Sequence, residues 1–121
     1  ARSTVAVLGV TFKENCPDIR NSKVIDLIRE LQSWNVNVVV ADAWADAAEV
    51  KHEYGLELTA LDAVDQVDGL VVAVGHDEYR SLKPEQLAAL CKAEHKPVIA
   101  DVKSLFDRHA LADAGFTVFR L

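Results

Sequence analysis

The chain has 121 residues, a formal net charge of -6 and a hydrophobic content of 50%. A chain of this size can bury the core of one ordinary domain without a metal or a disulfide. The negative charge argues against a general nucleic-acid or membrane-surface binder, because both partners are polyanions that attract basic surfaces. No apolar run approaches the roughly 18 residues of a membrane span, so we expect a soluble, cytoplasmic protein.

Six apolar segments have the character of strands and are separated mostly by helical patterns. In chain order they are residues 5–8, 36–41, 56–58, 70–74, 98–100 and 117–119. The runs at 38–40 and 70–74 lack polar alternation, which is typical of central parallel strands covered on both faces. This alternation predicts an α/β fold: a Rossmann-like, doubly wound, mostly parallel sheet of about six strands with helices on both faces.

Five helices are predicted between the strands. They cover residues 24–33, 45–54, 61–67, 84–93 and 105–114. The first has an apolar stripe with the period of a helix packed on a sheet, and Asn21 or Ser22 precedes it as a possible N-cap. Gly55 and Gly115 follow two others, where left-handed C-caps are common.

The connection over residues 9–24 joins the first strand to the first helix and is far longer than the roughly 2 to 6 residues that packing needs. It opens at the carboxyl edge of a strand, where α/β proteins build ligand sites. Lys13 and Arg20 lie in it together with the acids Glu14 and Asp18. A long charged loop at this edge favours a polyanionic ligand.

A dinucleotide fingerprint would place three spaced glycines after the first strand, but only Gly9 is present. Phosphate contacts must therefore come from side chains, chiefly Lys13, Arg20 and Lys103, which follows another strand. Each has a structural alternative: Lys13 as a surface lysine, Arg20 paired with Asp18 to stiffen the loop, and Lys103 exposed beside a strand-end cap at Asp101.

The run Phe-Lys-Glu-Asn-Cys-Pro-Asp-Ile-Arg-Asn-Ser, residues 12–22, resembles the signature that opens the C-terminal domain of the UDP-glucose/GDP-mannose dehydrogenase family. The resemblance extends through the whole chain and is strongest to the bacterial UDP-N-acetylhexosamine 6-dehydrogenase branch of surface polysaccharide biosynthesis. It implies an NAD-dependent UDP-sugar 6-dehydrogenase, which oxidises the C6 alcohol to a uronate in two hydride transfers.

The resemblance also implies that residues 1–121 are a single C-terminal UDP-sugar-binding domain, a fragment of a longer enzyme and inactive alone. In the family, an N-terminal domain binds NAD and a central helical domain carries most of the dimer interface, so the full enzyme is expected to be a homodimer or larger. The matching positions assign Phe12, Lys13 and Lys103 to the UDP-sugar and Arg20 to NAD.

The chain is expected to lack a catalytic residue and a metal site. Cys16 lies in the signature, but the family's catalytic cysteine belongs to a different motif, and Pro17 follows Cys16 without a histidine nearby. The four histidines have no metal-ligand spacing. His76 is interpreted as a loop histidine that caps the next helix with Asp77, or alternatively borders the ligand cleft.

Two non-catalytic functions compete with the dehydrogenase. A regulatory receiver module shares the layout, but it needs an acidic pair after its first strand, where this chain has Leu8 and Gly9. An assembly module, whose long loop only packs against neighbours, would keep its oligomerisation without binding UDP.

Overall fold

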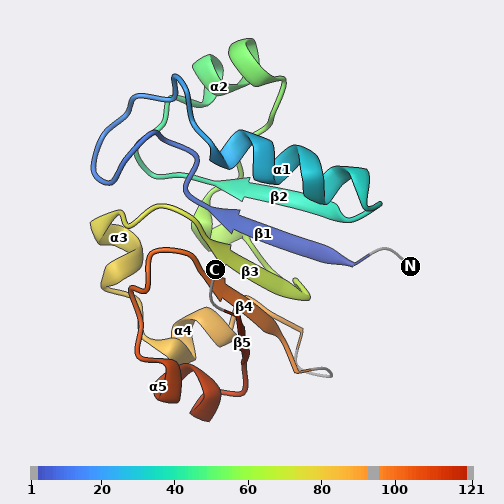
Figure 1. Ribbon diagram of the computed structural model, residues 1–121, viewed down its shortest axis with the longest axis vertical. Coiled ribbons are helices and arrows are strands. Elements are labelled where there is room, and N and C mark those ends of the chain that lie inside the picture. Colours follow the sequence, from blue (N-terminus) through green and yellow to red (C-terminus); the bar gives the residue numbers. More distant parts are fainter. Residues whose placement is uncertain (1–2, 93–95, 120–121) are drawn as a thin grey trace.

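The protein is described by a computed structural model that covers residues 3–92 and 96–119. Its strands form one parallel sheet in the order β2-β1-β3-β4-β5 (Figure 1). The strands are β1 Thr4–Leu8, β2 Asn37–Ala41, β3 Gly69–Val72, β4 Val98–Asp101 and β5 Thr117–Phe119. The chain moves from β1 outward to β2 and then returns to the other side of β1, so the sheet is doubly wound as predicted.

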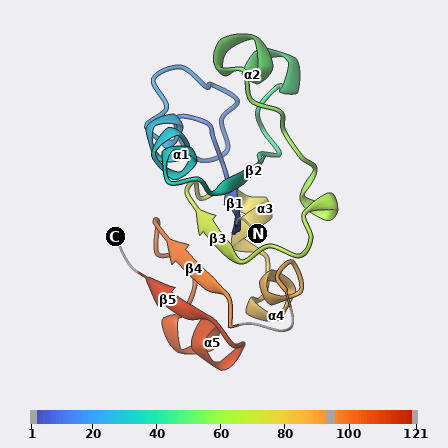
Figure 2. The same ribbon diagram turned by 90° about the vertical axis from the view of Figure 1, so that its right-hand side faces the viewer.

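The helices cover both faces of the sheet. They are α1 Val24–Ser33, α2 Ala47–Tyr54, the 3₁₀ turn η1 Leu61–Ala63, α3 Asp77–Arg80, α4 Pro84–Ala88 and α5 Arg108–Asp113. Figure 2 shows α1 and α4 on opposite sides of the strands. In the described part of the chain, no helix has the length and apolar character needed to cross a membrane.

Side chains of β1 alternate between two hydrophobic cores. Val7 packs with residues of α1 and α2 in one core, whereas Ala6 and Leu8 pack with residues of α4 and α5 in the other. All three side chains are fully buried. A strand covered on both faces needs apolar residues at every position, which explains the run at 70–74. The run at 38–40 was predicted to be central as well, but it forms β2 at the edge of the described sheet.

The expected sixth strand at residues 56–58 does not form in the described structure. Leu58 makes a single parallel bridge to Val40, and Leu56 packs into the core beside α1 and α2. One bridge is not a ladder, and the segment starts directly after Gly55, which has a left-handed backbone. The apolar side chains of this segment therefore fill a core without adding a strand to the sheet.

The first helix has the predicted bounds, but its predicted cap is wrong. Lys23 is the N-cap residue and provides no side-chain hydrogen bond. Asn21 has a φ of 57°, outside the extended conformation usual for an N-cap, and the Ser22 hydroxyl is buried without a hydrogen-bond partner among the described residues. The backbone of the long loop thus decides how α1 begins.

The other helices are shorter than predicted, and aspartate caps explain two of the differences. Asp46 accepts hydrogen bonds from the amides of Ala48 and Glu49, so α2 begins at Ala47. Asp107 caps α5 in the same way, and α5 begins at Arg108. The predicted left-handed residues at Gly55 and Gly115 are both confirmed.

Two further helix predictions were too long. The helix expected over 61–67 is only the turn η1, after which Val64 returns to an extended backbone. The helix expected over 84–93 ends as α4 at Ala88, and its last expected residue lies outside the described residues.

Candidate functional site

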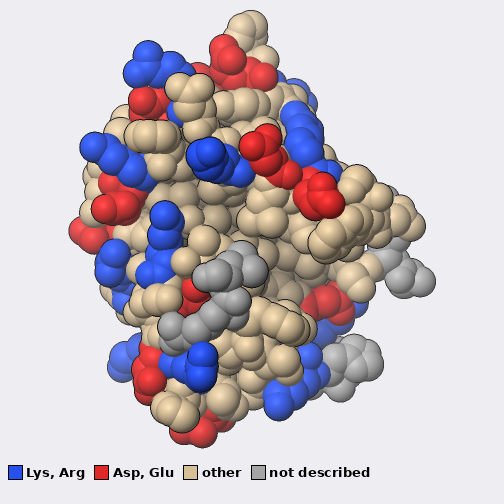
Figure 3. All heavy atoms as spheres, viewed as in Figure 1, with Lys and Arg blue, Asp and Glu red and all other residues tan. Residues whose placement is uncertain are grey.

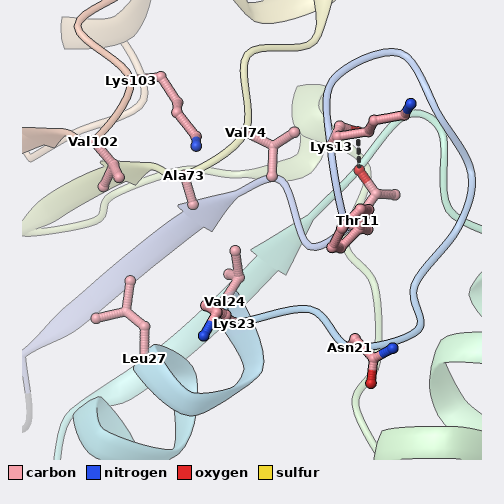
Figure 4. A pocket seen from close by; sticks show the side chains of 11 residues that line it. Thr11, Lys13, Asn21, Lys23, Val24, Leu27, Ala73, Val74, Val102 and Lys103 are labelled. Carbon is pink, nitrogen blue, oxygen red and sulfur yellow. Dashed lines mark hydrogen bonds between the residues drawn. The ribbon is translucent and has the colours of Figure 1, made fainter.

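The long loop after β1, residues 9–23, lies at the arrowhead end of the sheet beside α3 (Figure 1). A pocket of about 370 Å³ opens between this loop, the start of α1 and the segments that follow β3 and β4 (Figure 4). It is lined by Thr11, Phe12, Lys13, Asn21, Lys23, Val24, Leu27, Ala73, Val74, Val102 and Lys103. The structure thus brings the predicted substrate residues of two distant segments to one pocket.

The pocket combines positive charge with an apolar floor. Of the described residues, three lysines and no acidic residue line it, although the whole chain carries a net charge of -6. On the face drawn in Figure 3, Lys and Arg side chains are interspersed with Asp and Glu side chains. Ammonium groups suit phosphate oxygens, and the apolar floor suits a flat ring. The lining therefore fits an anion that has an apolar part.

The predicted side chains contribute differently to this pocket. The Lys103 ammonium is directed over Ala73 toward the pocket, whereas the Lys13 side chain extends away from it (Figure 4). The Phe12 side chain is exposed, with 59% of its surface accessible. Lys103 is placed to contact a ligand directly, while Lys13 reaches the same ligand only after a change of rotamer.

Asp101 holds the segment that carries Lys103. Its buried carboxylate accepts hydrogen bonds from the amides of Leu105 and Phe106, at 3.0 and 2.9 Å. The interpretation of Asp101 as a strand-end cap is confirmed. Lys103 is exposed, as the structural alternative expected, and also lines the pocket.

Arg20 is not among the residues that line this pocket. It borders a second hollow with Glu49, Glu53 and Tyr54. Its Nε and Nη2 donate to the two oxygens of Asp18 at 3.0 and 3.1 Å, and the side chain is 84% exposed. These hydrogen bonds lower the pKa of Asp18 and raise that of Arg20. The pairing interpretation of these two residues is confirmed.

Asp42 anchors the start of the long loop, a role that sequence reasoning missed. Its Oδ2 accepts from the amides of Val10 and Thr11 at 2.7 and 3.2 Å. Its Oδ1 accepts from the amides of Trp44 and Ala45 at 2.7 and 2.9 Å. The carboxylate is buried. It therefore ties the start of the loop to the segment that follows β2.

His76 completes this anchor; it occupies the N-cap position of the next helix, as predicted, but its side chain does not cap that helix. It precedes α3 but makes no side-chain cap; its ring is fully buried, with Nε2 3.0 Å from Asp42 Oδ2. The signal for this pair lay in the topology: Asp42 follows β2 and His76 follows β3, the two neighbours of β1. Among the described residues, no group of three or more potential ligands is arranged to hold a metal ion.

Comparison with known proteins identifies a related family. The sequence profile of the UDP-glucose/GDP-mannose dehydrogenase family, UDP binding domain, matches residues 6–108. A UDP-N-acetyl-D-glucosamine 6-dehydrogenase of Pseudomonas aeruginosa is 44% identical over 103 residues, which are 85% of this chain and 24% of that protein. A protein of the same name from Salmonella typhi is 41% identical over 101 residues, covering 84% and 23%.

Solved structures give the same picture of the fold. An NDP-N-acetyl-D-galactosaminuronic acid dehydrogenase from Methanosarcina mazei Go1 matches with a TM-score of 0.82 and 27% identity, over 98% of this chain and 24% of the other. A UDP-D-ManNAc dehydrogenase from Pyrococcus horikoshii matches with a TM-score of 0.76 and 22% identity, over 98% and 25%. The chain therefore spans about a quarter of the length of the proteins that it matches.

Proposed function

Because the chain belongs to the UDP-glucose/GDP-mannose dehydrogenase family and matches its UDP binding domain, we propose that it binds the UDP part of a nucleotide sugar. The observation that carries this proposal is the pocket with three lysines and no acid in its described lining, set over apolar side chains. A nucleoside diphosphate has the matching chemistry, since its diphosphate is anionic and the face of its flat base can pack on apolar side chains.

Within this pocket we assign the contacts to Phe12, Lys13 and Lys103. Lys103 donates to the diphosphate, which its direction over Ala73 supports. Phe12 and Lys13 contact the sugar end, where an exposed ring packs on the sugar and a mobile ammonium donates to its oxygens. Lys13 extends away from the pocket, so binding requires its rotamer to change.

For the longer protein, we infer an NAD-dependent UDP-sugar 6-dehydrogenase that converts a C6 alcohol to a uronate in two hydride transfers. Two relatives above 40% identity are named UDP-N-acetyl-D-glucosamine 6-dehydrogenases, which supports a UDP-N-acetylhexosamine as substrate and a role in surface polysaccharide biosynthesis. Cytoplasmic location and a homodimer or larger assembly belong to the same proposal. The 121-residue chain alone is expected to be inactive.

NAD does not fit the β1–α1 turn of this chain. Gly9 is followed by a long loop, and a valine and a threonine stand next to it, where a dinucleotide cradle needs further glycines. We therefore assign most of the NAD site to a separate N-terminal domain, beside a central helical domain. Arg20 is the residue of this chain proposed to contact NAD; its guanidinium is held by Asp18 and is largely exposed.

An NMR titration of the labelled chain tests the function, because chemical shifts detect the weak binding expected of a partial site. UDP, uridine and NAD are added separately. We expect UDP to shift the amides of Phe12, Lys13 and Lys103, and uridine to shift them less because it lacks the diphosphate. Shifts spread evenly over the chain, or none with UDP, would contradict the proposal. Self-association without UDP binding would instead support an assembly module.

A further inference from the structure

The hydrogen bonds around His76 define where its protons are. The backbone N–H of Asn15 donates to Nδ1 at 2.8 Å, so Nδ1 carries no proton. Nε2 is then the protonated nitrogen, and it faces Asp42 Oδ2 at 3.0 Å and Thr11 Oγ1 at 3.1 Å. Both oxygens can accept from it. His76 is therefore the neutral imidazole with its proton on Nε2.

Thr11 agrees with this direction of the hydrogen bonds. Its hydroxyl lies 3.0 Å from the carbonyl oxygen of Lys13, which can only accept. The Thr11 hydroxyl therefore donates its proton to the Lys13 carbonyl, and the Thr11 oxygen accepts from His76 Nε2–H. The network runs in one direction, from His76 through Thr11 to the backbone of Lys13.

His76 and Asp42 hold different ends of this loop segment. Asp42 accepts from the amides of Val10 and Thr11 without help from the imidazole. The Asn15 amide bonds to His76 Nδ1. Because the imidazole is fully buried, with the ring centroids of Trp44 and Tyr79 6.1 and 5.7 Å from its own, water cannot easily take over its bonds.

We propose that His76 is a positioning residue for the pocket: as the neutral Nε2–H tautomer it presents its bare Nδ1 to the Asn15 amide, and this hydrogen bond sets the backbone that carries Phe12 and Lys13. The inference rests on the proposed function, because these two side chains line the pocket that is assigned to the UDP-sugar. His76 touches no ligand itself and acts through the loop.

Two substitutions separate the hydrogen bonds of the two His76 ring nitrogens, because each variant keeps one bond and loses the other. The amide oxygen of His76→Asn takes the place of Nδ1 and accepts from Asn15, but loses the link to Asp42. The amide nitrogen of His76→Gln takes the place of Nε2 and donates to Asp42, but loses the Asn15 amide. The hydrogen bond from the Asp77 amide to Asn15 Oδ1 uses no atom of the His76 side chain, so we expect both variants to keep it.

A positioning role predicts opposite effects of the two variants. We expect His76→Asn to lose more stability against urea, because Asp42 is left short of a buried donor, yet to bind UDP within about twofold of the parent chain. We expect His76→Gln to unfold at higher urea than His76→Asn but to bind UDP about fivefold more weakly. Affinity losses that simply follow stability losses would overturn the inference.

Ile99→Val is the matched control, since it removes one methylene from a buried site in β4. It should lower stability and leave UDP affinity within about twofold. Nitrogen NMR of the imidazole in the unmutated chain is a test that needs no variant: we expect a protonated Nε2 and a bare Nδ1, and a protonated Nδ1 would overturn the inference. If the tautomer is the expected one but UDP does not bind, the proposed function is wrong. The positioning role, which depends on that function, is then wrong as well.

Discussion

A β-carbon placed on Gly9 would lie 2.6 Å from the β-carbon of Val74, closer than two such atoms approach in proteins. Gly9 directly follows β1 and begins the long loop, and Val74 follows β3, so the contact joins these neighbouring strands at the edge where the pocket opens. Gly9 also has a φ of +100°, which disfavours any side chain.

We therefore expect Gly9→Ala to destabilise the chain severely. Gly115→Ala is its control, because Gly115 has a φ of +105° and no described atom lies within 4 Å of the position that its β-carbon would take. The control should lose about 1 to 2 kcal/mol from backbone strain alone. Gly9→Ala should lose about 1 to 3 kcal/mol more from overpacking. Urea unfolding measures both, and equal losses would show that Val74 moves aside without cost.

Lys103 should contribute to UDP affinity through its charge. Replacing it by methionine keeps most of its length and removes the ammonium, so we expect UDP binding to weaken about three- to tenfold at low salt. The difference between parent and variant should shrink as salt is added, because the site is open to solvent. UDP titrations at two salt concentrations check both points.

Lys96→Met is the control for this experiment. Lys96 and Lys103 flank β4 at opposite ends, and both are exposed, but only Lys103 borders the pocket. The two variants therefore change the net charge equally. If Lys96→Met weakened UDP binding as much as Lys103→Met, the effect would come from overall charge, and the assigned contact would be wrong.

The sheet could be predicted from sequence because its strands carry their own signal. A strand buried on both faces must be apolar at each position, and the run at 70–74, which begins in β3, shows this without any tertiary information. The segment 56–58 was also predicted as a strand, although Glu57 separates its two leucines, and its role depends on whether a partner strand continues beside it. Only the single bridge from Leu58 forms, which no local pattern could reveal.

The part of the candidate site that could be predicted is the part whose position follows from the sheet topology alone. Lys13 and Lys103 follow strands of one parallel sheet, so their segments had to meet at one edge, and they border one pocket. The anchor formed by Asp42 and His76 depends on directional hydrogen bonds between residues far apart in the chain. Sequence gives no local sign of such bonds, and the nearest local partner, Asp77, suggested a helix cap instead.

The pair of Asp18 and Arg20 should be visible in the acid titration of Asp18. Its pKa is lowered because Arg20 donates to the charged form, first through the side chain and then through the backbone amide. A lowered folded-state pKa adds stability above the ordinary carboxyl pKa, and that stability is lost as the pH falls through the lowered value. Carbon NMR of the carboxyl group follows this titration directly.

Arg20→Gln is the informative substitution, because it removes the charge and leaves the backbone hydrogen bond to Asp18. We expect the pKa of Asp18 to rise toward 3.8 without reaching it. Stability at neutral pH should hardly change, since exposed ion pairs contribute little. An unchanged Asp18 titration would mean that the pair does not persist in solution.

Cys91 should make stability depend on alkaline pH. Burial raises the pKa of its thiol to about 11, with a smaller contribution from the Asp68 carboxylate. The buried neutral thiol stabilises the fold fully below the ordinary thiol pKa of 9.0, and this stability is lost as the pH rises from there toward 11. Over that window the free energy of unfolding should fall by about 1.4 kcal/mol for each pH unit.

Cys91→Ala isolates this effect from the titration of other groups. The variant should be less stable at neutral pH because it leaves a small cavity, but its stability should fall less steeply above pH 9 than that of the parent chain. A thiol reagent gives an independent readout: at pH 8, half-buried Cys16 should react while buried Cys91 stays protected until the chain unfolds. Equal reaction rates of the two thiols in the folded chain would show that the segment after α4 opens readily and that burial does not hold the Cys91 proton.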